Sequence, residues 1–384
     1  MPLARWPATA DREAGGCLRP SRRRAARPAG GTVMRVLPRQ LLSGHQMRRR
    51  GSELSSLVVL AVALEVAAGV GLAYLAGFSN VHAVLRSFDW PWLTGLFGAL
   101  IISFVGYYYA YRGMFRVGNG PRLPRRQLRA VVAAGFGGFI AHGGGALDQY
   151  ALEASGADEE EAKARTAGLA GLEHGVLSIG ATAAAIAVLA LGRSQPPLDF
   201  TLPWAIIPIP GFLVAFWLAE RYRDGFRDRP GWRRHVSIFL DSIALIRRMF
   251  ARPRRWWPAL VGMAVFWVMD AFAAWAGLAA FGYQADVAAL YIGFATGMVF
   301  TRRTGPLAGA GVLALVLPVT IWSSGSPFAV AVVGIFAYRI LALLLPLPVS
   351  LAALPTLRKM GEHREPRAED IAKSPTEPGL RRTA

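Results

Sequence analysis

The chain has 384 residues, 53% of them hydrophobic, and a mean hydropathy of +0.34, yet it carries a formal net charge of +19. A soluble globular protein does not combine these values, whereas a polytopic membrane protein does, because its apolar spans alternate with arginine-rich loops. The single cysteine, Cys17, excludes a disulfide framework and any cysteine-based metal cluster. We therefore expect an all-α, polytopic helical membrane protein.

The N-terminal residues 1–46 are rich in Arg, Ala, Pro and Gly, a composition that predicts a disordered basic tail. The arginines at 22–24 are compatible with contact to nucleic acid or anionic lipid, although we expect no specific nucleic-acid partner. Translation can start at Met1, Met34 or Met47, and the sequence leaves the choice open. A transmembrane domain is expected over residues 47–357, followed by a disordered, charged cytoplasmic tail over 358–384.

Eight spans are expected, on the basis of apolar stretches that can cross a hydrocarbon layer of about 30 Å. They cover residues 54–78, 92–111, 170–192, 201–219, 258–282, 286–301, 305–323 and 328–355. With the N-terminus in the cytoplasm, the outside loops hold only Arg86 and Arg193, whereas residues 112–129 carry six arginines and 220–257 carry eleven. The positive-inside rule then places both termini in the cytoplasm of a bacterium, with the chain in its cytoplasmic (inner) membrane.

Three stretches between the spans have their own character. Residues 128–147 are glycine-rich, and we interpret them as a re-entrant segment, since broken backbone at membrane depth must be covered by protein or line a wet cavity. Residues 153–169 read as a polar cytoplasmic helix with acidic residues in its first turn. Residues 230–257 resemble an amphipathic interfacial helix, with an apolar stripe opposed to arginines.

Two small-residue breaks, at 141–150 and 304–313, lie in opposite halves of the chain. Paired breaks of this kind indicate a transporter-like central site, and freed backbone N–H groups at a break can bind an anionic headgroup. The candidate headgroup-binding residues are Arg302, Arg303 and the backbone around Gly309 and Gly311, together with Arg339 and Arg112 elsewhere in the chain. The alternative is that the small residues only let helices pack closely.

Ionisable residues inside or beside the spans are candidates for a polar cavity, because each is unfavourable in the bilayer unless it is paired or wet. The candidates are Glu65, His142, Asp148, Glu173, His174, Asp270 and Arg339. Arg339 needs a carboxylate partner, for which Glu173 and Asp270 are the candidates. Alternatively, these residues form structural pairs between helices.

An aromatic cluster, FVGYYYAYRGMF, occupies residues 104–115. Its tyrosines fit an interfacial aromatic belt. They also fit the lining of a headgroup path that includes Arg112.

The sequence resembles the lysylphosphatidylglycerol synthase transmembrane region, also called the flippase-like domain family. The resemblance covers roughly residues 40–360 and rests on short motifs in the expected order: Tyr-Arg-Gly at 111–113, a glycine-rich turn and amphipathic helix at 143–169, Leu-Glu-His at 172–174, TRR-x-x-PLAGAG from 301, and Ala-Tyr-Arg at 337–339. It implies about eight spans, two re-entrant or broken segments, and movement of modified phospholipid between leaflets.

The chain departs from the family pattern at several acidic positions. Gly145 and Asp148 stand where relatives have Glu and then Arg, His174 replaces the Arg that follows Glu173, and Ala314 replaces a Glu. These departures put the activity in doubt, or indicate a different substrate. We expect no aminoacyltransferase domain, because only a short polar segment follows residue 355.

Three functions remain open. The leading one is binding and translocation of an anionic phospholipid or isoprenoid-linked lipid, with no cofactor; the chain has no G-x-x-x-x-G-K-[ST] sequence, and its scattered histidines predict no metal site. The second is a membrane enzyme of lipid-linked glycan assembly, or a subunit that partners an envelope-biosynthesis enzyme. The third is a non-catalytic membrane scaffold. A homo-oligomer is compatible with each.

Overall fold

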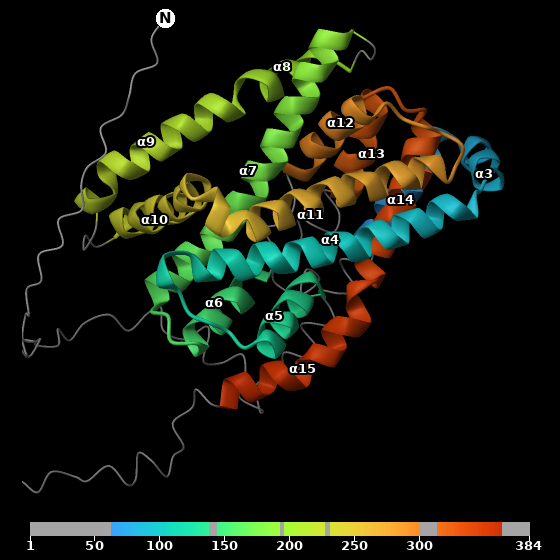
Figure 1. The fold of residues 1–384 in the computed structure, drawn as a ribbon. Coiled ribbons are helices and arrows are strands. Elements are labelled where there is room, and N and C mark those ends of the chain that lie inside the picture. Colours follow the sequence, from blue (N-terminus) through green and yellow to red (C-terminus); the bar gives the residue numbers. More distant parts are fainter. Residues whose placement is uncertain (1–62, 138–143, 193–195, 227–230, 300–312, 363–384) are drawn as a thin grey trace, which may run out of the picture.

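The computed structural model describes residues 63–137, 144–192, 196–226, 231–299 and 313–362, drawn as coloured ribbon in Figure 1. Within these ranges every regular element is a helix, as expected for the fold class. Five helices are long and apolar enough to cross a membrane: Trp90–Asn119, Glu159–Leu191, Leu198–Phe226, Pro253–Ala279 and Phe328–Leu357. The described part of the chain is therefore consistent with a multi-pass membrane protein.

The first expected span, 54–78, is described only from residue 63. A helix over Ala63–Ala76 meets α3 (Phe78–Arg86) at a bend of 99°, and the two together are apolar enough for a sixth span. Gly77 at the bend has φ 82°, in the left-handed region that glycine adopts without strain. Most of the expected outside loop, 79–91, is thus helical, which corrects the sequence-based boundary.

The centre of the molecule is an antiparallel pair of long helices, α4 (Trp90–Arg116) and α11 (Pro253–Ala279), which lie along each other in Figure 1. A Cβ added to Gly106 would lie 2.5 Å from the carbonyl oxygen of Gly262, and a Cβ on Gly262 would lie equally close to Gly106 O. Nearer the end of α4, Gly113 faces Ala259. Small residues therefore bring the two backbones together.

Two pairs of short helices follow the two central helices. After α4 come α5 (Arg125–Gly137) and α6 (Gly144–Ala154), and after α11 come α12 (Val287–Val299) and α13 (Leu313–Ser323). The links at 138–143 and 300–312 lie outside the described residues. Residues 144–150 of the first expected break are helical in α6, which corrects that boundary.

The short helices bear directly on the span count. α12 has 13 residues and α13 has 11, whereas about 20 are needed to cross the hydrocarbon core. The described parts of the expected spans 286–301 and 305–323 are therefore too short to count as spans by themselves, and the count of eight is not confirmed. The expected re-entrant segment, 128–147, falls on α5, α6 and the undescribed residues between them, with 13 and 11 residues in the two helices, and it stays a prediction.

Residues 153–169 and 170–192, expected to form two elements, belong mostly to one helix, α7 (Glu159–Leu191). Its N-cap is Asp158, whose Oδ1 accepts a hydrogen bond from the N–H of Glu161 at 2.7 Å. Glu159, Glu160 and Glu161 fill the first turn, as predicted. The polar segment thus continues without interruption into the apolar one.

Two of the long helices, Leu198–Phe226 and Phe328–Leu357, contain a one-residue interruption just before a proline. α8 (Leu198–Ile206) is followed by α9 (Pro208–Phe226), and α14 (Phe328–Leu344) by α15 (Pro346–Glu362). Each second helix starts at a proline, whose missing N–H suits the first turn of a helix. α15 packs on α5, where Ser350 donates its hydroxyl to the carbonyl of Ala133 at 2.6 Å.

The amphipathic segment 230–257 forms α10 (Trp232–Ala251) and the first turn of α11. Its apolar stripe does not simply face lipid: Leu240, Ile243, Ile246 and Met249 are buried, and α10 packs against α7 and α9. Phe239 is 60% exposed. Most of the apolar stripe is therefore covered by other helices, and the expected interfacial position of this helix stays a prediction.

The element order repeats. A long helix, two short helices and a long helix occur as α4–α7 and again as α11–α14. The first helix of each set, α4 and α11 respectively, runs antiparallel to the other. Buried side chains of α4, α7 and α11 form the main core between them.

Candidate functional site

Two tyrosines of α4 hold two carboxylates that come from other helices. Tyr107 donates its hydroxyl to Glu173 Oε1 of α7 at 2.5 Å, and Tyr111 donates to Asp148 Oδ1 of α6 at 2.6 Å. The tyrosines are four residues apart, which places them on one helix face, with ring centroids 6.1 Å apart. Glu173 and Asp148 are 1% and 2% exposed. One face of α4 therefore positions two buried acids.

The tyrosine cluster divides between core and surface. Tyr107 and Tyr111 are buried, whereas Tyr109 is 44% exposed. The aromatic-belt interpretation is consequently wrong for Tyr107 and Tyr111, although it still fits Tyr109. Arg112, the candidate from the same motif, is half-buried next to Tyr111.

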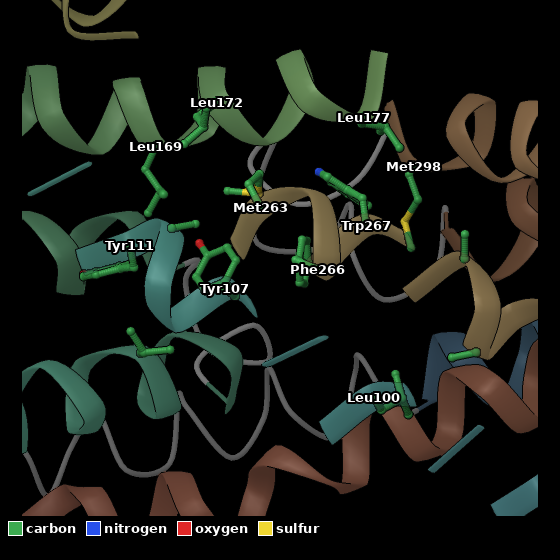
Figure 2. Close-up of a cluster of buried hydrophobic side chains, with 14 of the residues drawn as sticks. Leu100, Tyr107, Tyr111, Leu169, Leu172, Leu177, Met263, Phe266, Trp267 and Met298 are labelled. Carbon is green, nitrogen blue, oxygen red and sulfur yellow. The ribbon is translucent and has the colours of Figure 1, made fainter. Parts of the chain in front are cut away.

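The central helix α11 also contacts Glu173, through the backbone carbonyl of that residue. Trp267 donates its indole N–H to the backbone carbonyl of Glu173 at 2.7 Å. Figure 2 shows Tyr107 and Trp267 directed toward α7, and the Tyr107 and Phe266 rings lie 5.1 Å apart. Asp270, three residues beyond Trp267 on α11, is only 2% exposed. The centre of the protein thus combines an aromatic wall with buried carboxylates.

A buried ion pair joins the N-terminal helix to α14. Arg339 donates through Nε to Glu65 Oε1 at 3.0 Å and through a terminal nitrogen to Glu65 Oε2 at 3.3 Å. One turn away, a Cβ on Gly69 would lie 2.9 Å from the ring of Phe336, so the two helices are close along this stretch. The prediction that Arg339 has a carboxylate partner is confirmed, but the partner shown is Glu65, which was not among the two candidates.

Arg165 is a buried charge that the sequence analysis did not single out. Its side chain on α7 is 3% exposed and pairs with Glu161 at 2.6 Å. One terminal nitrogen also donates to the carbonyls of Phe115 at 3.0 Å and Val117 at 2.8 Å. The guanidinium therefore satisfies carbonyls that the end of α4 leaves without intrahelical partners.

The remaining candidates fall elsewhere. Arg302, Arg303, Gly309, Gly311 and His142 lie outside the described residues. His174 is half-buried, and its Nδ1 lies 2.8 Å from the carbonyl oxygen of Ala170 in the preceding turn of α7. Although it follows Glu173 in sequence, the contact shown for its ring is local to its own helix.

The chemistry of the centre follows from the desolvation of its charges. Glu65, Asp148, Glu173 and Asp270 are each less than 10% exposed, and a carboxylate in that setting needs a hydrogen bond or a counter-charge. Tyrosine hydroxyls and an arginine supply these contacts for three of them. Buried carboxylates of this kind can hold a proton or a cation. A carboxylate that pairs with an arginine can also separate from it, so that the arginine can bind an anion. Among the described residues, no group of three or more His, Cys, Asp or Glu is placed to hold a metal ion.

No protein-family model and no curated protein matches the chain, so the resemblance to the flippase-like domain family stays a prediction.

Proposed function

We propose that the protein binds an anionic phospholipid or an isoprenoid-linked lipid and moves its headgroup across a bacterial cytoplasmic membrane, with both termini in the cytoplasm. Support comes from the ionisable side chains buried among helices that are apolar enough to span a bilayer. Buried charges are rare in such helices and characterise the pathways of polar substrates and ions.

The observation that carries the proposal is the position of these charges relative to the repeated elements. Asp148 belongs to the first short pair, Glu173 and Asp270 to the long helices, and Arg339 to the long helix that follows the second short pair. Many transporters have oppositely directed repeats with broken helices, and their substrate sites lie between the repeats.

Each group has a defined role in the proposal. Arg302 and Arg303, which follow α12 in the sequence, would bind the phosphate of the headgroup, since a guanidinium offers two parallel donors. The Glu65–Arg339 pair would separate to offer Arg339 to the same anion inside the bilayer. The chain has no Walker sequence, so we propose that movement is downhill or coupled to an ion gradient.

The test is lipid scrambling by purified protein in liposomes that contain a fluorescent anionic phospholipid and receive an impermeant quencher. Arg303→Ala and Arg339→Ala should each abolish protein-dependent movement of the probe. Arg233→Ala is the matched control, because Arg233 is an exposed arginine at the start of α10, and it should scramble at the wild-type rate. Circular dichroism and gel filtration establish that every variant is folded.

Two results would contradict the proposal in different ways. Scrambling that survives both substitutions would remove the site assignment while leaving the function. A folded wild-type protein that moves neither anionic phospholipids nor polyprenyl phosphates would remove the function itself. Turnover of a lipid-linked sugar in that case would favour the enzyme hypothesis, and inertness would favour the scaffold.

A further inference from the structure

A cavity of about 680 Å³ lies apart from the buried acids, where the ends of four elements meet. It is lined by η1 (Val117–Asn119) after α4, by the last turns of α9 and α10, and by the first turn of α11, which converge at one end of the molecule in Figure 1. Its volume is within the roughly 300–1,000 Å³ of ligand sites. Five arginines line it: Arg223, Arg247, Arg248, Arg252 and Arg255. We call it the basic pocket.

The charges in the basic pocket do not balance. Two acids also line it, Glu220 and Asp224. Arg247 pairs with Glu220 at 3.0 Å, and Arg223 lies 3.5 Å from Asp224 and 3.6 Å from Asp241, an acid outside the lining. The other three arginines have no ion pair with any described residue, which leaves an excess of three positive charges around one cavity. An anion is therefore the complementary ligand.

The local backbone fixes where these three arginines lie. Arg248 is in the last turn of α10, Arg252 is the single residue between α10 and α11, and Arg255 is in the first turn of α11. Gly118 has φ 64°, and a Cβ there would lie 2.9 Å from a terminal nitrogen of Arg248. Glycine at 118 thus leaves room for the Arg248 guanidinium.

The surroundings of the basic pocket are those of a lipid headgroup. The pocket lies at the ends of three helices that are long and apolar enough to cross a membrane. Leu213 and Trp217 on α9 are 65% and 56% exposed, and Trp257 beside the pocket is 60% exposed. Tryptophan is enriched at the bilayer interface, where headgroups are located.

We propose that the basic pocket binds the phosphate of an anionic phospholipid, whose acyl chains lie against the exposed apolar face of α9. The recognised chemistry is a phosphate ester held by Arg248, Arg252 and Arg255, and guanidinium groups bind phosphate with paired donors. A soluble phosphate ester has the same recognised group but lacks the acyl chains. This site is separate from the buried acids, and it does not depend on transport.

The experiment compares phospholipid binding to the full chain by native mass spectrometry in detergent. The probes are phosphatidylglycerol, zwitterionic phosphatidylcholine of the same chain length, and inorganic phosphate as competitor. The pocket variant carries Arg248→Gln, Arg252→Gln and Arg255→Gln. The control variant carries Arg221→Gln, Arg233→Gln and Arg254→Gln, which change three exposed arginines that do not line the pocket.

The wild type and the control variant should retain phosphatidylglycerol over phosphatidylcholine, and inorganic phosphate should not displace it. The pocket variant should bind phosphatidylglycerol at least about tenfold more weakly, as expected when several charge-assisted hydrogen bonds are lost. Gly118→Ala should weaken binding less, by displacing Arg248 alone.

Equal loss in the pocket and control variants would overturn the proposal, because it would show that surface charge alone retains the lipid. Full displacement by inorganic phosphate would overturn the lipid assignment in favour of a soluble anion. A protein that binds phosphatidylglycerol here but does not scramble lipids would leave this inference standing and refute the proposed function.

Discussion

A close contact between α4 and α11, at Gly106, allows the cost of one substitution to be estimated from the geometry. A Cβ introduced by Gly106→Ala would lie 2.5 Å from Gly262 O and 2.9 Å from the amide nitrogen of Phe266, whereas ordinary contact begins at 3.4 Å. Both neighbouring atoms belong to the backbone and cannot rotate away, so α4 and α11 must separate. Overpacking of this kind costs about 1–3 kcal/mol, and we expect a loss near the upper end.

Gly98→Ala is the matched control on the same helix. Nothing lies within 4 Å of a Cβ at Gly98, so this variant should gain the roughly 0.5–1 kcal/mol by which alanine exceeds glycine in a helix. The measurement is the free energy of unfolding in mixed detergent micelles, followed by loss of helical circular dichroism. Equal stabilities for Gly98→Ala and Gly106→Ala would refute the close approach of the two helices and the reasoning drawn from it.

The remaining predictions concern the buried polar contacts and use the same unfolding measurement. Arg339→Ala leaves Glu65 buried without its counter-charge and should lower the free energy of unfolding by about 3–5 kcal/mol. Adding Glu65→Gln to this variant should recover part of that loss. If the two substitutions are simply additive, Arg339 and Glu65 do not pair directly. Tyr107→Phe removes a donor to a buried carboxylate and should lower the free energy of unfolding by about 1.5–3 kcal/mol. Tyr109→Phe, at an exposed position, should change it by less than about 0.5 kcal/mol. Equal values for the two variants would contradict the burial of Tyr107. Arg165→Gln should increase proteolysis at the end of α4, because two or more carbonyls there lose their charged donor, and an unchanged cleavage pattern would contradict that role.

The long apolar helices could be predicted from the sequence because hydropathy is a local property. The stretches 92–111 and 258–282 correspond to α4 and α11, with boundaries that differ by a few residues. The two short helices α12 and α13 could not be predicted as such, because their composition is as apolar as that of a full span.

The partners of the buried charges could be predicted only in part. An arginine in an apolar helix requires an acid, but Glu65 is 274 residues away from Arg339, and several acids satisfied the same requirement. Arg165 was overlooked because Glu161 lies one turn away, so the pair reads as an ordinary surface contact. Its hydrogen bonds to α4 carbonyls depend on tertiary packing, which cannot be predicted from a local sequence pattern.

The length of α7 has a mechanical consequence. Its 33 residues make a rod of about 50 Å at 1.5 Å per residue, well beyond the roughly 30 Å of hydrocarbon. Arg165 links α7 to α4 by a hydrogen bond to the Phe115 carbonyl. Nearer the other end of α7, Thr182 donates its hydroxyl to the Trp204 carbonyl of α8 at 2.8 Å. Because Glu173 lies between these two contacts, and its carboxylate accepts a hydrogen bond from Tyr107 of α4 at 2.5 Å, its position relative to α4 and α8 is held from both sides.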